Sequence, residues 1–280
     1  MAGRRYGIRD GVPEPFAIGL APVDGADWLR PDDRLHPYLD EKERLNAVDP
    51  RAVWAALPGT QGAQAEAAAM VADWLADHSP RHDDRGAVIG RPAPDPVLPP
   101  LMRAALTVTD DLVVMRKMNG AWVLAAAALH FPSAWRLHEK IGRPLHAVHA
   151  PVPGFGAGTR HAMLIERMLD NLKPGIVVAR GNWSLHAEDA LHLPDAAHGL
   201  ADAAPLHRRA ERQTLRRLPG GDVLFTIDVT VARVDALPEE EARVTARQIG
   251  ALDDGQRGYK GLAEDAGAVA RRLEGNGGRG

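Results

Sequence analysis

The chain has 280 residues, with 34 Lys and Arg against 37 Asp and Glu, and it has no cysteine. This length suits one large domain or two small ones, and 45% hydrophobic with 25% charged residues is typical of a globular protein. The absence of cysteine excludes disulfides, iron–sulfur clusters, zinc–cysteine sites and thiolate-ligated haem within the chain. The formal net charge of −3 provides no broad attraction for nucleic acid or an anionic membrane.

The N-terminal segment is basic, but it is not followed by the apolar stretch of roughly 7–15 residues that a secretory signal requires. The longest apolar run, Ala121–Leu129, is far too short to span a bilayer. We therefore expect a soluble, cytoplasmic protein.

The first hundred residues are expected to be helical and irregular. Apolar residues recur at helical spacing in Gln61–His78, and Ser79-Pro80 would end that helix. A shorter helix is expected over Pro50–Leu57. Five prolines in Arg91–Pro100 predict a stiff extended connector, which either separates two domains or packs as a strap on one.

From residue 101 onward the pattern changes to strands. Asn119-Gly120 stands between two apolar runs, and this pair is the strongest short-range signal for a hairpin because both residues tolerate positive φ. A second tight turn is expected at Pro219–Asp222. The five predicted strands are Asp111–Met118, Ala121–Phe131, Ile176–Leu185, Arg208–Leu218 and Val223–Val234.

Helical stretches are expected at Ser133–Ile141 and Arg160–Leu172, between the second and third strands, and again over Leu237–Leu273. This order predicts an α+β fold: a PAS-like five-stranded antiparallel sheet with helices on one face, plus helical N- and C-terminal extensions. The expected divisions are an N-terminal extension packed on the core over 1–100, the PAS-like core over 101–236, a C-terminal extension over 237–273 and a disordered tail over 274–280.

No familiar catalytic signature is present: the sequence has no phosphate-binding loop after a strand, no HExxH and no GxSxG. The glycine cluster Gly154–Gly158 follows a proline-rich segment rather than a strand. Binding of a cofactor phosphate there has roughly one chance in twenty, judged by that context.

Five histidines fall within about thirty residues, and imidazole is the usual haem-iron ligand when no thiolate is present. For any single one, a surface or hydrogen-bonded role has odds of roughly four to one. His149 stands out because the rigid segment Ala150–Pro153 follows it, which reduces the entropy lost in fixing a ligand. The five are His130, His138, His146, His149 and His161.

The fourth predicted strand is unusually polar. Alternation places Arg209, Glu211, Gln213, Leu215 and Arg217 on one face and Ala210, Arg212, Thr214, Arg216 and Leu218 on the other. A solvated face with cross-strand ion pairs is favoured at roughly three to one by the pattern alone. The functional alternative is that Glu and Arg side chains face a pocket, where they polarise a ligand or hold a cationic amine, with Asn182 or Ser184 of the third strand as a hydrogen-bond donor.

Several blocks of sequence together resemble one family, the haem-dependent oxidative N-demethylase-like proteins. The blocks follow one another along nearly the whole chain: Phe16–Trp28 with Asp32–Arg34, His130–Pro144, Val148–Phe155, Asn182–Ser184, Glu211–Pro219 and Tyr259–Leu262.

This resemblance implies a haem-binding subunit with a PAS-like fold. The implied activity is the oxygen-dependent removal of a methyl group from a small alkylamine, such as dimethylamine, with release of formaldehyde. The implied cofactor is haem b, and the electrons would come from separate reductase and iron–sulfur partner subunits. That agrees with a chain that has no cysteine for a cluster and no flavin or nucleotide fingerprint.

The family motifs also suggest roles for single residues. His149 becomes the first choice for the axial ligand of the haem iron, and His186 is the second. Candidates for the oxygen and substrate side of the haem are Glu211, Arg212 and Gln213, while Asn182, Lys140, Arg143 and Arg217 are candidates for binding the cofactor, the last three through its propionates.

Two alternatives remain open at this point. The same fold could hold haem only to sense a gas, or it could have lost haem and serve as a scaffold subunit. The sequence has no output domain and no coiled-coil heptads, which favours the enzyme.

Overall fold

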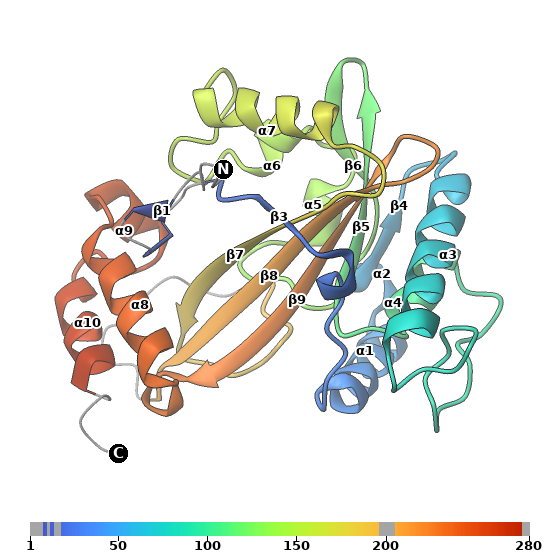
Figure 1. The fold of residues 1–280 in the computed structure, drawn as a ribbon. Coiled ribbons are helices and arrows are strands. Elements are labelled where there is room, and N and C mark those ends of the chain that lie inside the picture. Colours follow the sequence, from blue (N-terminus) through green and yellow to red (C-terminus); the bar gives the residue numbers. More distant parts are fainter. Residues whose placement is uncertain (1–7, 10–11, 14–17, 196–204, 276–280) are drawn as a thin grey trace.

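The computed structural model describes residues 8–9, 12–13, 18–195 and 205–275. Its centre is a seven-stranded sheet in the order β3-β7-β8-β9-β5-β6-β4, in which each neighbouring pair is antiparallel (Figure 1). The strands are β3 (Ala21–Val23), β4 (Trp54–Ala56), β5 (Asp111–Met118), β6 (Ala121–Ala128), β7 (Val177–His186), β8 (His207–Arg217) and β9 (Val223–Arg233). A separate ribbon pairs β1 (Ile8–Arg9) with β2 (Val12–Pro13).

Helices precede, interrupt and follow these strands. The first group is η1 (Gly25–Asp27), α1 (Leu35–Val48), α2 (Pro50–Val53), α3 (Gln61–His78) and α4 (Pro100–Ala105). Between β6 and β7 lie α5 (Leu137–Lys140), α6 (Leu145–Val148) and α7 (Arg160–Asn171). The chain then closes with η2 (Val234–Ala236), α8 (Glu239–Gly250), α9 (Asp254–Tyr259) and α10 (Ala266–Gly275).

The five predicted strands form the contiguous middle of the sheet, but the predicted number of five was wrong because two short strands extend it. Three residues are too few to show an alternating pattern, so neither β3 nor β4 has a sequence signal. The segment of β4 had been assigned to the helix Pro50–Leu57, which instead ends at Val53. The segment Trp54–Ala56 pairs with β6, and this pairing overrides the helix propensity of Ala55 and Ala56.

The tight turn between β5 and β6 is confirmed. Asn119 has φ +49° and Gly120 has φ +84°, as a two-residue hairpin turn of this type requires.

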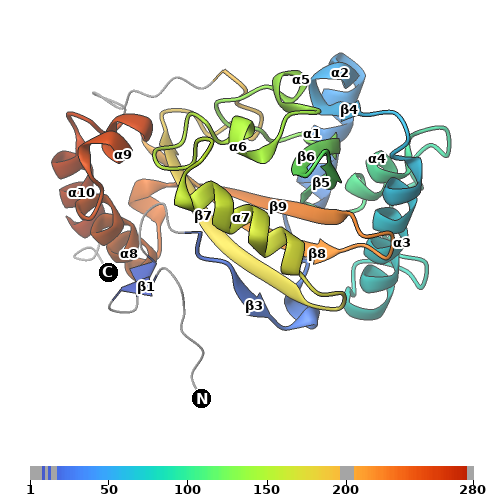
Figure 2. The same cartoon turned by 90° about the horizontal axis from the view of Figure 1, so that it is seen from above.

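Helices lie on both faces of the sheet, so the prediction of one covered face was wrong. Successive residues of β8 point to opposite faces. Arg217 reaches the carboxyl end of α7, whereas Thr214 accepts a hydrogen bond from Trp28, which packs against Trp74 of α3. Figure 2 shows α7 lying across β7 and β8. We call the face covered by α7 the α7 face.

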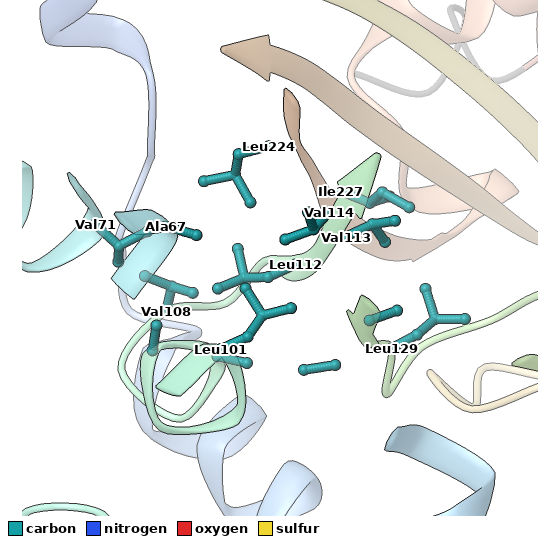
Figure 3. Close-up of a cluster of buried hydrophobic side chains, with 14 of the residues drawn as sticks. Ala67, Val71, Leu101, Val108, Leu112, Val113, Val114, Leu129, Leu224 and Ile227 are labelled. Atoms are coloured by element: carbon teal, nitrogen blue, oxygen red, sulfur yellow. The ribbon is translucent and has the colours of Figure 1, made fainter. Parts of the chain in front are cut away.

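The main core joins the sheet to the N-terminal helices, so residues before and after the proline-rich connector are buried together. Ala67 and Val71 of α3 meet Leu101, Leu112 and Leu224 in one cluster (Figure 3). A second cluster packs α8–α10 against Trp183 and Leu185 of β7. These two cores lie toward opposite ends of the sheet (Figure 1).

Two predictions need correction, one for a helix and one for the C-terminal tail. In Ser133–Ile141 only α5 is helical, because Pro132 and a positive φ at Ala134 delay its start. The region Leu237–Leu273 contains three helices, and α10 continues to Gly275, so residues 274 and 275 of the expected tail are helical. Residues 276–280 of that tail lie outside the described residues. Among the described helices, none combines the length and apolar character needed to cross a bilayer.

Candidate functional site

His149 lies at the end of the short helix α6. Its Nδ1 is 3.0 Å from the carbonyl oxygen of Leu145, one turn earlier. A carbonyl oxygen can only accept a hydrogen bond, so Nδ1 carries the proton and Nε2 keeps its lone pair. Burial lowers the pKa of His149, and the nearby charges of Arg180 and Lys140 lower it further. The result is a neutral imidazole with a fixed tautomer, whose Nε2 makes no hydrogen bond with any residue that the structure describes.

The proline-rich loop after α6 folds back over this imidazole. The buried ring of Phe155 lies 6.2 Å from the His149 ring and stacks on His161 of α7 with 4.8 Å between centroids. His161 is in turn fixed by the contact between its Nδ1 and Gly154 O at 3.1 Å. The loop and the first turn of α7 therefore form one wall next to His149.

An open hollow of about 380 Å³ lies against this wall. Its volume is within the range of small-molecule pockets. His146 and Ala162 line both this hollow and the narrow crevice that holds His149 and Phe155. His149 lines the crevice, and the hollow beyond His146 and Ala162 is lined further by Met163, Glu166, Arg167 and Asp170.

A polar cluster lies on the α7 face of β7 and β8. Asn182 pairs with Glu211 across the two strands, and its amide donates to Glu211 Oε2 at 3.3 Å. Gln213 donates to the same oxygen at 2.9 Å. On the other side Arg209 Nε is 3.8 Å from Oε1. Two amides therefore orient the Glu211 carboxylate, and Arg209 balances its charge.

Arg209 is itself held in place by backbone carbonyl groups. Its side chain is 1% exposed, and its guanidinium donates to Leu191 O at 2.8 Å and to Phe131 O. Phe131 belongs to one of the blocks on which the family resemblance rests. That block is connected to Glu211 through a buried arginine, a link that sequence reasoning missed because Arg209 read as a surface charge.

Arg180 is a second missed residue. It pairs with Gln213 and therefore points to the same face as Asn182 and Glu211. Its charge acts on both His149 and Glu211. The alternation of side chains along the strand could have identified it, because a residue two positions before Asn182 lies on the same face of the sheet.

Arg212 points to the opposite face from Glu211 and Gln213. Its guanidinium donates to Trp28 O at 2.7 Å and to Asp27 O, in the segment that leads into α1. The structure therefore does not bring Arg212 together with the other two predicted catalytic residues.

Arg217 is on the α7 face but is used to fix α7. It donates to Leu172 O at 3.0 Å and to Leu169 O, and it lies 5.2 Å from the ring of Trp122. These bonds satisfy carbonyl groups at the carboxyl end of α7, as basic side chains commonly do.

The other predicted cofactor residues differ in their distance from His149. Lys140 donates to Val148 O at 3.2 Å, directly before His149. Arg143 is exposed, and its side chain makes no hydrogen bond or ion pair with any described residue. His186 is buried farther along β7, where its Nε2 contacts Ser184 Oγ at 2.8 Å and Ser133 Oγ at 3.2 Å. With Nε2 engaged by two hydroxyls, His186 is less available as a ligand than His149.

The donor set fits haem better than a bare metal ion. Within the described ranges no three His, Asp or Glu side chains converge as a group that could hold a metal. A porphyrin supplies four nitrogen ligands of its own and needs one axial donor from the protein. His149 offers such a donor, and its Nδ1–H bond to a carbonyl is the usual support for a ligating histidine.

The chain was compared with curated proteins and with models of protein families. A search of curated proteins gives no match to this chain. A family model described as "Haem-dependent oxidative N-demethylase, alpha subunit-like" matches residues 19–270. This range contains every site residue discussed above, from Lys140 to Arg217. The chain therefore belongs to the haem-dependent oxidative N-demethylase, alpha subunit-like family.

Proposed function

We propose that this chain is the haem b-binding subunit of a monooxygenase that removes a methyl group from a small N-methylated amine. Overall, the N-methyl amine, one dioxygen, two electrons and two protons would give the demethylated amine, formaldehyde and water. The bound haem would supply the activation of oxygen. Oxygen and the amine would be the small-molecule partners.

The observation that carries this proposal is the Nε2 of His149, which makes no hydrogen bond with a described residue while Nδ1 is fixed by Leu145 O. A neutral histidine fixed through Nδ1 is what an axial ligand requires. Family membership independently indicates dependence on haem.

Glu211 would bind the ammonium group of the substrate. Both amide donors, Asn182 and Gln213, bind its Oε2, and Oε1, which lies 3.8 Å from Arg209 Nε, would accept the hydrogen bond from the ammonium. Because the two amides hold the carboxylate, it does not need to reorganise when the amine binds.

The electrons would come from separate reductase and iron–sulfur subunits, since a chain without cysteine cannot hold an iron–sulfur cluster.

We also propose that β5–β9 form the PAS-like core. Numbered one to five in chain order, these strands lie side by side in the order 2-1-5-4-3.

The first test is a haem titration followed by the Soret absorption. We expect the wild type to give a Soret band at one haem per chain, and His149→Ala to lose or shift it. His186→Ala is the matched control, because His186 is also a histidine of the α7 face, and it should keep the wild-type spectrum. A wild type without a Soret band would refute the proposal, and a His149→Ala spectrum identical to the wild type would refute the assignment of the ligand.

The second test measures formaldehyde. Haem-loaded protein is supplied with a reductant, oxygen and a panel of N-methylated amines, and we expect formaldehyde from at least one of them. Glu211→Gln should raise KM for that amine more than tenfold while the Soret band is unchanged, since it removes the anionic partner of the ammonium. Arg212→Gln, which alters the opposite face, should leave KM within about twofold.

A further inference from the structure

We propose that Arg180 is a ligand-binding residue that pairs with a carboxylate of the molecule bound next to His149. This inference rests on the proposed function and adds the chemical class of a group that the site recognises.

Arg180 is placed toward the site by the register of the sheet. It lies on β7 opposite Gln213, two residues before Asn182, and therefore shares their face. The edge strand β3 pairs only with residues 177–179 of β7, so Arg180 comes directly after the end of that pairing. Its charge is felt by His149, which lies under the loop that follows α6 on the same face.

The guanidinium of Arg180 has no partner among the residues that the structure describes. Its Nε is buried and makes no hydrogen bond. No hydrogen bond or ion pair from its terminal nitrogens to a described residue is present either. Three arginines of the neighbouring strand β8 differ from it, because Arg209, Arg212 and Arg217 each donate to backbone carbonyls.

Arg180 is partly buried as a residue, and its buried Nε–H without an acceptor is costly unless something binds it. Burial lowers the pKa of Arg180, and the charge of Glu211 only partly opposes this. Glu211 cannot be its full partner, since it lies within 3.8 Å of Arg209, which already balances it. The cluster of Glu211, Arg209 and Arg180 therefore carries an excess positive charge.

An anion with planar geometry would satisfy this charge. The fork of a guanidinium matches the two oxygens of a carboxylate, and such pairs are among the strongest hydrogen-bonded contacts in proteins. Two carboxylates could reach this position: a propionate of the haem, or a carboxylate on the amine substrate, as in an N-methyl amino acid. The chemistry recognised is the same in both cases.

The first arm of the experiment compares haem with haem dimethyl ester, in which both propionates are blocked. Dissociation constants are measured by Soret titration for the wild type, Arg180→Met and Arg85→Met. If the carboxylate is a propionate, the wild type should prefer haem to the ester by about tenfold or more, and Arg180→Met should lose most of that preference. Arg85→Met removes an arginine whose side chain is 83% exposed and which has no role in the candidate site, and it should keep that preference.

The second arm compares N-methylglycine with dimethylamine. Their dissociation constants are measured from the perturbation of the Soret band of the haem-loaded protein, without turnover. If the carboxylate belongs to the substrate, the wild type should bind N-methylglycine more tightly, and Arg180→Met should weaken N-methylglycine about tenfold while dimethylamine changes less than twofold.

Arg180→Lys serves as a second variant in case the methionine variant does not fold. It keeps the charge but not the fork, and it should recover only part of whichever preference the wild type shows. The proposal is overturned if haem binds and neither preference depends on residue 180. Absence of any Soret band in the wild type would instead refute the proposed function, and this inference would fall with it.

Discussion

The indole of Trp28 donates a hydrogen bond of 3.0 Å to the hydroxyl of Thr214, and this bond joins residues 186 positions apart. Trp28 is completely buried and packs edge-on against Trp74, with 6.1 Å between ring centroids. Arg216 lies 4.1 Å from the centre of the same indole. Trp28 thus fastens the N-terminal segment to the face of β8 opposite the candidate site.

Replacing Trp28 with phenylalanine should lower the free energy of unfolding by about 1–3 kcal/mol. The substitution removes the donor to Thr214 and leaves a gap beside Trp74. Urea denaturation provides the measurement. Trp135→Phe is the control, because the partly buried Trp135 indole makes no hydrogen bond with a described residue, and it should cost less than about 1 kcal/mol.

Gly86 is the glycine at which a side chain should be least tolerated. Its φ is +73°, and a Cβ there would lie 2.6 Å from the carbonyl oxygen of Ala72 in α3. We expect Gly86→Ala to cost more than about 3 kcal/mol, as backbone strain is added to a clash with a helix. Gly90 has φ +82° but open space around it, so Gly90→Ala should cost only about 1 kcal/mol. Equal urea midpoints for the two variants would contradict this account.

Asp110 should make stability depend on pH. Burial and the charge of Asp228 raise the pKa of Asp110 from 3.8 to about 7, and its Oδ1 has no hydrogen-bond partner. Between about pH 4 and pH 7 the folded state therefore binds a proton that the unfolded state has lost. The contribution of Asp110 to stability thus falls as pH rises through this window, by roughly 1 kcal/mol per pH unit.

Asp110→Asn is expected to remove that slope. The stability of the variant relative to the wild type should increase from pH 4 to pH 7, as measured by denaturation at a series of pH values. Asp95, an exposed carboxylate in the proline-rich connector, provides the control: Asp95→Asn should leave the slope unchanged. Parallel curves for the wild type and Asp110→Asn would show that the carboxyl group of Asp110 does not titrate in this range.

His149→Gly offers a test of ligation that does not depend on turnover. The substitution leaves a gap of the size of an imidazole under Phe155. We expect added imidazole to restore a Soret band that matches the wild type, because the free base can occupy the vacated position. His138→Gly, at an exposed site on α5, should show no response to imidazole. Restoration in neither variant, with haem still bound, would move the ligand to another residue.

Local signals in the sequence were enough to predict the middle of the sheet. Asn119-Gly120 fixed the turn of one hairpin, and the bounds of β5 follow directly from it. The alternation along β8 correctly separated Glu211 from Arg212. Tertiary pairing decided the rest: Trp54–Ala56 became a strand only because the edge of β6 was available to it.

The candidate site was only partly predictable for a different reason. The role of His149 came from the family resemblance, and no spacing rule indicated that Leu145 O would fix its tautomer. Glu211, Arg212 and Gln213 were grouped because they match a motif of the family, although neighbours on a strand face opposite ways. The sequence pattern favoured a solvated face for Arg209, and Arg180 was not singled out. Their burial depends on the loop and helices that cover the α7 face, and these contacts are not encoded locally.

The short edge strand β3 has a consequence for the behaviour of the protein in solution. Beyond residue 179 the outer edge of β7 has no strand partner among the described residues, and such an edge invites pairing with another chain. Lys260, directly after α9, donates to the carbonyl oxygen of Trp183 and lies 4.4 Å from its ring, so a charged side chain is held against that edge. The C-terminal helices therefore protect this edge from pairing with other chains. A chain shortened before α9 would expose the edge of β7 and should aggregate more readily.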